Sequence, residues 1–579
     1  MWLLKLNRTP RLILICVVLG VTGALGAQLF LFLLHLVDTY VLSAIGHYHT
    51  ISIGEAHAID PAPKPFSHWY WWMPVSTTLG GLVAGLLIYG LGPETAGHGT
   101  DATLNAFHLN SGRMRARVPF LKTIVSAITI GTGGSGGREG PTAQIASGVG
   151  AIIGNLFKLP DDERRIVILI GMAAGLSAIF KSPLGTAIFA VEILYSGMAF
   201  EGSALIYTLI SAAVSYAITG AISGYTPLFL LSPSTRTLEP LDLAWFGILG
   251  ILAGSVGALM PAVYYRIRDW FAALEIPRYL KPAIGGFAVG LIGIAAPPII
   301  GGGYGYMQFV LQGGSGLAVW VLLLFSFGKI LTLSLTVGSG GSGGVFGPTL
   351  YVGVMLGGAF ASLLHLFHVD IDSSWLAVVG MAAVFAGTAR VPIASMVMVI
   401  EMTGGFELIM PSMLAVALAF VVQLTLTRNA KYPTIYEGQT STPADSPVYR
   451  DLFYQTAAGL LRRQQVHLDS DLLKSELQAA LDRGDGVALR GRQEHLYSLT
   501  LSAGTSVAGR EVRSLGLGDM GTLIVGLIRG ESEIIPHGDT RLQVGDGLLV
   551  AATSDSIKQF RALVAAPQAK AVTRIATDL

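Results

Sequence analysis

Two glycine-rich segments of nearly identical sequence are the parts of this chain best suited to bind a ligand. Residues 133–142 read GGSGGREGPT, and residues 340–349, which lie 207 positions later, read GGSGGVFGPT. Each precedes an apolar helical stretch, so each leaves backbone N–H groups uncovered at a helix N-terminus, which carries partial positive charge. Two such ends facing each other would bind an anion without a buried basic side chain. Neither segment is a phosphate-binding P-loop, because neither ends in Gly-Lys followed by Ser or Thr.

A second duplicated segment follows each of the first. GMAAGLSAIFKSPLGTAIFAVEI begins at Gly171, and GMAAVFAGTARVPIASMVMVIEM begins at Gly380, with Pro183 and Pro392 at the same place in both. A repeated half with helices broken by Gly and Pro at matching positions indicates a substrate site between two halves of a transporter or channel. The sequence leaves open whether the halves are parallel or inverted.

The elements that carry these segments have the composition of a polytopic membrane protein. Hydrophobic residues make up 52% of the 579 positions and charged residues 13%, and the mean hydropathy is +0.61. A net charge of +1 argues against a nucleic-acid-binding protein. The single cysteine, Cys16, excludes a disulfide scaffold and a Cys-ligated zinc site. Apolar runs near the length of a membrane span lie at 12–34, 74–91, 166–180, 204–219, 243–263, 282–300, 317–336, 376–386 and 413–426.

Charge divides the chain into two parts. The last 138 residues hold 31 of the 73 charged residues, and the Pro- and Ser-containing stretch 438–447 has the composition of a linker. We therefore predict a transmembrane domain over 1–440, a connecting segment over 441–495 and a small soluble domain over 496–579.

Basic residues predict the orientation of the membrane domain. Lys5, Arg8 and Arg11 precede the first apolar run, and Arg428 and Lys431 follow the last one. The positive-inside rule therefore places both termini in the cytoplasm of a multi-pass protein of the plasma (inner) membrane. No metalloprotease, nucleophile-elbow or phosphate-loop motif is present, so we expect neither an enzyme nor a bound metal or cofactor.

The duplicated segments resemble those of the CLC chloride channel and transporter family. The resemblance rests on GREGP at 137–141, GVFGP at 344–348, the paired repeats and EMTGGFELIMP at 401–411, and it covers about residues 10–440. It implies a polytopic α-helical fold of two inverted, broken-helix repeats, embedded in membrane lipid. It also implies a homodimer with one pore per subunit, and chloride or a similar small anion as the substrate.

The resemblance assigns roles to individual residues. Glu139 matches the family's gating glutamate, whose carboxylate competes with the anion and leaves when it is protonated. Tyr436 resembles the tyrosine whose hydroxyl contacts the central anion, and Tyr432 is the alternative choice. The other positions that match anion-binding residues of the family are Gly97, His98, Gly99, Gly140, Val345, Phe346 and Gly347.

Position 98 departs from the family pattern. The segment Gly97-His98-Gly99-Thr100-Asp101 aligns with a motif that usually reads GSGIP, so a histidine stands where a serine hydroxyl normally meets the anion. A neutral imidazole donates one N–H, and a protonated one adds full positive charge near physiological pH. We therefore expect His98 to tune anion preference or to make flux sensitive to pH. The alternative is that His98 turns away from the pore and only packs.

Position 193 is the second departure. Proton-coupled members of the family often carry an internal glutamate that aligns with Ile193, and isoleucine carries no proton. The neighbouring Glu192 is a poor substitute, because an adjacent helical residue points about 100° away. This favours a passive chloride channel gated by Glu139. One alternative is a proton-coupled anion antiporter with a replacement relay, and another is a ligand-sensing or assembly subunit of a different transporter.

The C-terminal domain has the pattern of a small α+β module. Apolar, β-branched runs lie at 523–528 and 547–550 between turn signals, and helical patterns lie at 471–482 and 554–564. Residues 497–564 resemble the C-terminal RCK (TrkA-C-type) domain of potassium transport proteins. Such domains dimerise, and some bind a nucleotide or cyclic dinucleotide between subunits. The candidate contacts are Ile528, Arg529 (for a phosphate), Pro536 and His537, and the alternative is a dimerisation module without a ligand.

Overall fold

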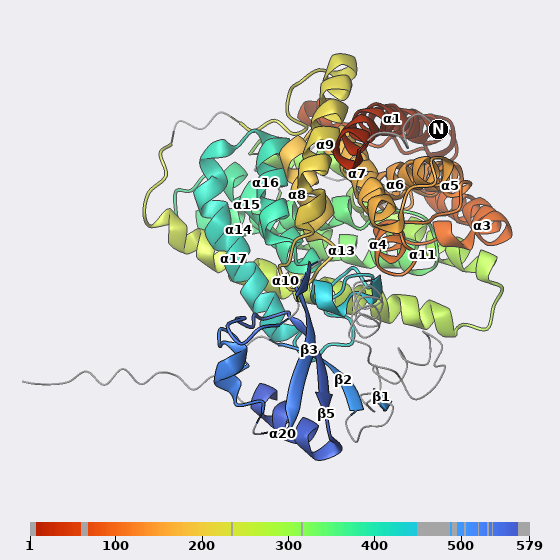
Figure 1. Cartoon of the computed structure of the whole chain (residues 1–579). Coiled ribbons are helices and arrows are strands. Elements are labelled where there is room, and N and C mark those ends of the chain that lie inside the picture. Colours follow the sequence, from red (N-terminus) through yellow and green to blue (C-terminus); the bar gives the residue numbers. More distant parts are fainter. Residues whose placement is uncertain are drawn as a thin grey trace, which may run out of the picture. The chain divides into compact units, whose positions relative to one another are not determined.

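The computed structural model divides the chain into two compact units, Met1–Gln439 and Thr440–Leu579 (Figure 1). The predicted helix at 471–482 and most of the connecting segment 441–495 lie outside the residues that the structure describes. Those residues are 7–58, 68–232, 236–313, 317–448, 487–488, 495–502, 505–518, 520–529, 532–534 and 536–565.

The first unit is α-helical, which confirms the predicted polytopic fold (Figure 1). Among its described residues, seven helices are long and apolar enough to cross a membrane. The sequence reading missed the span over residues 346–366, because its glycines dilute the apolar signal. The helices of this unit are α1 (Arg8–Val37), α2 (Ser43–Ile45), α3 (Met73–Leu91), α4 (Thr100–His108), α5 (Val118–Gly131), α6 (Glu139–Leu156), α7 (Asp161–Phe180), α8 (Pro183–Glu192), α9 (Gly202–Ser223), α10 (Asp242–Ala273), α11 (Lys281–Ala295), α12 (Tyr304–Leu311), α13 (Val319–Gly338), α14 (Phe346–Leu366), α15 (Ser373–Ala389), α16 (Pro392–Thr403) and α17 (Ile409–Leu426).

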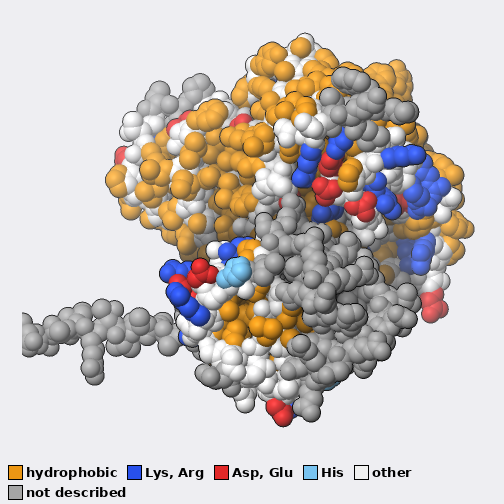
Figure 2. Space-filling view, viewed as in Figure 1, with side chains coloured by type: hydrophobic (Ala, Val, Ile, Leu, Met, Phe, Trp, Pro, Cys, Tyr) orange, Lys and Arg blue, Asp and Glu red, His pale blue; other side chains and the backbone are white. Residues whose placement is uncertain are grey.

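Large apolar side chains cover much of the outer surface of this unit (Figure 2). Phe32 on α1 is 60% exposed, and Ile206 on α9 is 68% exposed. Contiguous apolar surface of this extent is rare in soluble proteins and is stable when it faces lipid.

Matching breaks interrupt the helices in the two halves of the unit. Lys181 ends α7 and Arg390 ends α15, both with positive φ (52° and 55°), and a proline begins α8 or α16 two residues later. A left-handed residue closes a helix, and proline is favoured at the first position of the next. The breaks are 209 residues apart, so the sequence repeat is also a structural repeat.

The two halves meet at their glycine-rich segments. The Gly137 N–H donates to the Gly344 carbonyl and the Gly344 N–H donates to the Gly137 carbonyl, both at 2.7 Å, in an antiparallel bridge. These glycines occupy equivalent positions in the two repeats, and such a reciprocal pair is expected where a two-fold axis relates the halves. The predicted inverted repeats are related by such an axis when it lies in the membrane plane.

The second unit contains an antiparallel sheet whose described strands follow the order β1-β2-β5-β3-β4. Its buried core includes Leu527 on β3, Leu548 and Val550 on β5, and Phe560 on the helix that follows. The helix predicted at 554–564 is present and one residue longer. The elements are β1 (Val487–Ala488), β2 (His495–Thr500), β3 (Thr522–Arg529), β4 (Ser532–Ile534), β5 (Gly547–Ala552) and α20 (Ser554–Ala565).

Candidate anion site

The N-termini of α6 and α14 are held together by the bridge between Gly137 and Gly344. Helix α6 begins at Glu139 and α14 begins at Phe346, each inside its glycine-rich segment. The first-turn N–H groups of a helix have no partner within that helix. The side chain of Phe346 packs against Phe180 and Phe385, with ring centroids 4.5 and 3.9 Å away. Position 346 therefore presents only backbone to the space between the two helix ends.

The carboxylate of Glu139 occupies the N-terminus of α14. Its side chain is fully buried, and its Oε2 accepts the Gly347 N–H at 3.2 Å. A Cβ on Gly347 would lie 2.9 Å from the same oxygen, so this approach requires glycine. The glutamate thus takes the place that the sequence reading assigns to an anion, and it excludes that anion by its charge and its volume.

Tyr304 holds the same carboxylate from the other side. The Tyr304 hydroxyl, at the start of α12, donates to Glu139 Oε1 at 2.5 Å. The Arg138 guanidinium lies 4.3 Å from the centroid of the Tyr304 ring. The sequence reading did not identify Tyr304, because it lies far from the glycine-rich motifs and outside the repeat that they define.

His98 lies against the first turn of α6. A Cβ on Gly140 would come 2.1 Å from the His98 carbonyl, so these two backbones are in close contact. Gly99, with φ of 87°, turns the chain into α4. The His98 side chain is buried, its Nε2 lies 3.0 Å from Asp101 Oδ2, and its Nδ1 makes no hydrogen bond among the described residues.

Tyr436 is the tyrosine that faces His98. Their ring centroids are 5.4 Å apart. The Tyr436 hydroxyl lies near Thr100 and makes no hydrogen bond of ordinary geometry within the described chain. Tyr432 instead stacks on Tyr265, with centroids 4.0 Å apart. His98 Nδ1 and the Tyr436 hydroxyl are therefore two polar atoms in one region that lack a hydrogen-bond partner among the described residues. Tyr432 lies elsewhere, against Tyr265.

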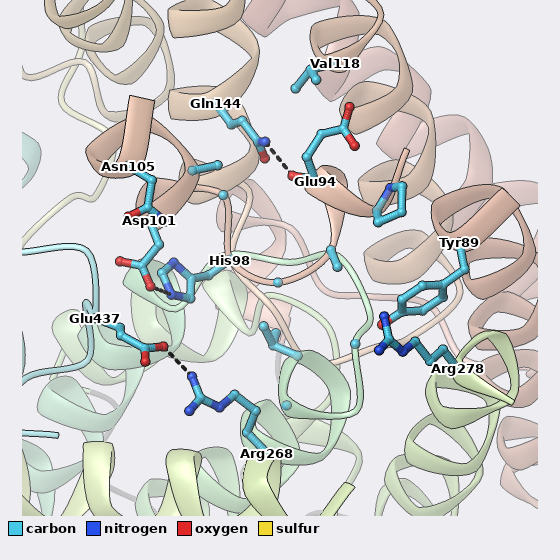
Figure 3. A pocket seen from close by; sticks show the side chains of 18 of the residues that line it. Tyr89, Glu94, His98, Asp101, Asn105, Val118, Gln144, Arg268, Arg278 and Glu437 are labelled. Carbon is cyan, nitrogen blue, oxygen red and sulfur yellow. Dashed lines mark hydrogen bonds and ion pairs between the residues drawn. The ribbon is translucent and has the colours of Figure 1, made fainter. Parts of the chain in front are cut away.

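Asp101 contacts both His98 and the backbone close to Tyr436. One of its oxygens meets His98 Nε2, and the other accepts the backbone N–H of Gly438 at 3.0 Å, two residues after Tyr436. His98 and Asp101 line a cavity of about 810 Å³ (Figure 3). Several charges around the cavity are paired, as in the ion pair between Arg268 and Glu437 at 2.5 Å. The cavity gives solutes an approach to His98.

Two buried lysines correct the expectation of a site without buried basic side chains. Lys122 Nζ donates to the carbonyls of Thr95 and Gly97 at 3.0 and 2.9 Å. Lys329 Nζ donates to the carbonyls of Ile299 and Gly301 at 3.1 and 2.6 Å, and it interacts electrostatically with Glu139. Both side chains are fully buried. Their 207-residue separation, equal to that of the glycine-rich motifs, was the sequence signal that could have revealed them.

Glu192 and Glu401 cap each other's helices. Glu192, at the end of α8, accepts the N–H groups of Ile393 and Ala394 in α16, at 3.2 and 2.7 Å. Glu401 in α16 accepts the Gly185 N–H in α8 at 2.8 Å. Ile193 is fully buried, and its carbonyl accepts from Gln439. The Glu192 carboxylate is therefore bound to the start of α16. This agrees with the expectation that Glu192 points in a different direction from residue 193.

The predicted ligand contacts of the second unit lie around β3. The Arg529 guanidinium forms an ion pair with the buried Asp546 at 2.8 Å, which raises the pKa of Arg529 and fixes the side chain. Its role as a phosphate contact stays a prediction, and in this structure the guanidinium is paired with that carboxylate. Pro536 and His537 lie on the turn that follows β4, with His537 exposed. Ile528 lies in β3, and its side chain is outside the described set.

Comparisons with known proteins match both units. The voltage gated chloride channel profile matches residues 80–424, and the TrkA-C domain profile matches residues 496–565. The H(+)/Cl(-) exchange transporter ClcA of Vibrio campbellii is 30% identical over 66% of this chain and 78% of its own length. The voltage-gated ClC-type chloride channel ClcB of Escherichia coli is 29% identical over 62% and 86%. A solved slow cyanobacterial Cl-/H+ antiporter is similar with a TM-score of 0.62, at 25% identity, over 75% of this chain and 97% of that one.

Proposed function

Because this chain belongs to the voltage gated chloride channel family, we propose that it is a proton-coupled chloride exchanger of a bacterial inner membrane. The observation that carries the proposal is the Glu139 carboxylate bound at the N-terminus of α14. An ionised carboxylate is favoured at such a helix end, and a protonated one is favoured much less. The occupant of the site is therefore sensitive to a proton.

The ionised Glu139 carboxylate and chloride compete for this position. When Glu139 gains a proton, its charge-assisted bonds to Gly347 and Tyr304 weaken, and chloride replaces it at the helix end. When the proton leaves, the carboxylate returns and displaces the anion. When it is protonated, Lys329 adds positive potential that favours either occupant. Because one position alternates between the two occupants, anion movement and proton movement are linked.

The prediction of a passive channel is wrong. It rested on Ile193, which occupies the position of the family's internal proton carrier. The Vibrio campbellii relative is named an H(+)/Cl(-) exchange transporter, and the solved cyanobacterial neighbour is a Cl-/H+ antiporter. Isoleucine at one aligned position does not make a channel, because a carboxylate from another segment can carry the proton.

The reversal potential tests the proposal in planar bilayers that contain the purified protein. With chloride concentrations fixed, a coupled exchanger changes its reversal potential when a pH gradient is imposed. A passive anion channel keeps the reversal potential set by chloride alone. A reversal potential that ignores the pH gradient would refute coupling.

Replacing Tyr304 by Phe is expected to speed chloride exchange at neutral and alkaline pH. The change removes a donor to an ionised carboxylate, a bond worth about 1.5–3 kcal/mol, so Glu139 leaves the site more readily. We expect roughly tenfold faster efflux from liposomes, with less dependence on pH. Tyr351→Phe is the matched control, because this buried hydroxyl makes no hydrogen bond among the described residues. Equal rates in the two variants would contradict the role of Tyr304.

Replacing His98 by Ser is expected to reduce the pH dependence of chloride binding. A protonated imidazole beside Asp101, Tyr264 and Tyr436 adds positive charge to this region, so binding to the wild type should strengthen as pH falls. Isothermal titration with chloride at several pH values measures the effect. If the pH profile of His98→Ser matches that of the wild type, the pH-sensing role is wrong and His98 contributes only packing.

We propose that the TrkA-C module assembles or regulates the transporter. The module's profile match supports a homodimer and a regulatory ligand such as a nucleotide or cyclic dinucleotide. The proposed orientation has both termini in the cytoplasm. Family membership assigns transport to the membrane unit, which argues against a subunit that only serves another transporter.

A further inference from the structure

The segment that joins α8 to α9 returns to the last turn of α8. The Glu201 N–H donates to the Val191 carbonyl at 3.2 Å, so residue 201 lies next to the turn that ends at Ile193. The Glu201 side chain is only 7% exposed. A carboxylate separated in sequence from position 193 is thereby brought beside it.

The Glu201 carboxylate is held by two hydroxyl groups. The Tyr195 hydroxyl donates to Oε2 at 2.9 Å, and the Ser203 hydroxyl donates to Oε1 at 2.8 Å. Tyr195 is fully buried. A hydroxyl can donate to an ionised carboxylate and can accept from a protonated one, so this pair suits both protonation states.

Other titratable side chains surround this pair. The His108 ring at the end of α4 lies 5.8 Å from the Tyr195 ring, and its Nε2 is 3.2 Å from the Leu194 carbonyl. Arg165 on α7 lies over the Phe107 ring and interacts electrostatically with His108. Glu192 on α8 faces α16 and binds there.

The cluster lies at the end of the membrane unit where α1 begins. Arg11 near the start of α1 forms a buried ion pair with Glu163 near the start of α7, and Arg165 follows two residues later. This is the end that the basic residues of the sequence assign to the cytoplasm.

Helix α8 connects this cluster to the anion site. The Phe189 ring, within one turn of Val191, lies 5.4 Å from the ring of Phe346. Phe346 precedes Gly347, whose N–H binds the Glu139 carboxylate. Glu201 and Glu139 are therefore joined through one short helix and one aromatic contact.

We propose that Glu201 is the cytoplasmic proton carrier of the exchanger, in place of the carboxylate missing at position 193. The proposal rests on the proposed function of proton-coupled exchange. Ionised Glu201 takes a proton from water at the cytoplasmic end and becomes a neutral acid. It then gives that proton, through intervening water, to ionised Glu139, so Glu201 regains its charge and Glu139 loses its own. No other co-reactant is needed, and the reverse sequence releases the proton.

Glu201→Gln tests the assignment in liposomes with an imposed chloride gradient and a pH electrode. The amide keeps an oxygen for Tyr195 but does not take up and release a proton, so we expect proton movement to fall by about tenfold or more while chloride efflux persists. Glu201→Asp should keep proton movement, because it keeps the carboxylate. Asp162→Asn, at an exposed carboxylate near the same end, should match the wild type.

The outcomes separate this inference from the proposed function. If the wild type moves no protons uphill, exchange itself fails. If the wild type is coupled and Glu201→Gln is equally coupled, only the assignment of Glu201 fails. The assignment also fails if Glu201→Gln and Glu201→Asp lose proton movement equally, or if both stop chloride efflux, because Glu201 would then act through packing.

Discussion

Replacing Glu139 by Gln is expected to abolish proton transport and to leave a chloride pathway that no longer depends on pH. Glutamine has nearly the same volume and keeps an oxygen for the Tyr304 hydroxyl and the Gly347 N–H. Without a charge it binds the helix end less strongly, so chloride replaces it at every pH. We expect proton movement in liposomes to drop by about a hundredfold or more, to the leak of empty vesicles.

The control for this variant is Glu407→Gln. Glu407 is exposed in a short 3-10 turn, so its loss of charge should leave both fluxes as in the wild type. Coupled proton movement that survives in Glu139→Gln would contradict the account, because no other described carboxylate binds the Gly347 N–H at the N-terminus of α14.

Replacing Glu192 by Ala is expected to destabilise the membrane unit strongly. The change removes the acceptor of the buried Ala394 N–H and of the part-buried Ile393 N–H at the start of α16. An unsatisfied buried donor costs about 1–3 kcal/mol, so we expect the loss of the Ala394 bond alone to lower the free energy of unfolding by about 1–3 kcal/mol. Thermal unfolding in detergent, followed by size-exclusion chromatography, measures the fall in apparent Tm.

Two further variants sharpen this test. Glu192→Gln keeps an acceptor oxygen and should lie between Glu192→Ala and the wild type. Glu407→Ala removes an exposed carboxylate and should unfold like the wild type. If Glu192→Ala also unfolded like the wild type, the reciprocal caps of α8 and α16 would not stabilise the fold.

The repeats allowed most of the fold to be predicted. The two GGSGG segments and the matched prolines indicated duplicated, broken helices, and the structure confirms them. The orientation of the repeats could not be predicted, because it depends on contacts between segments far apart in the sequence, such as the pairing of Gly137 with Gly344. The buried lysines were missed for a different reason: a lysine in an apolar run resembles a helix-end residue until its carbonyl partners are known.

The prediction of a passive channel rested on a single aligned position. Because Ile193 stands where proton-coupled members of the family often carry a glutamate, the sequence indicated the loss of a proton carrier. The α8–α9 segment returns on itself and sets Glu201 beside Val191, which the sequence pattern did not reveal. Tyr304 was not predicted for a similar reason, because α12, which carries it to Glu139, lies far from Glu139 in the sequence. The ion pair of Arg529 was not predicted, because its partner, Asp546, lies on a separate turn of the chain.

The most direct test of proton-coupled exchange is the direction of proton movement in liposomes that contain only the wild-type protein. The vesicles hold high chloride, both sides have the same pH, and an external electrode follows the protons. Chloride efflux leaves the interior positive, so a passive proton leak would move protons outward and lower the external pH. We predict that protons instead move inward against this potential and raise the external pH. A falling or unchanged external pH during chloride efflux would contradict exchange.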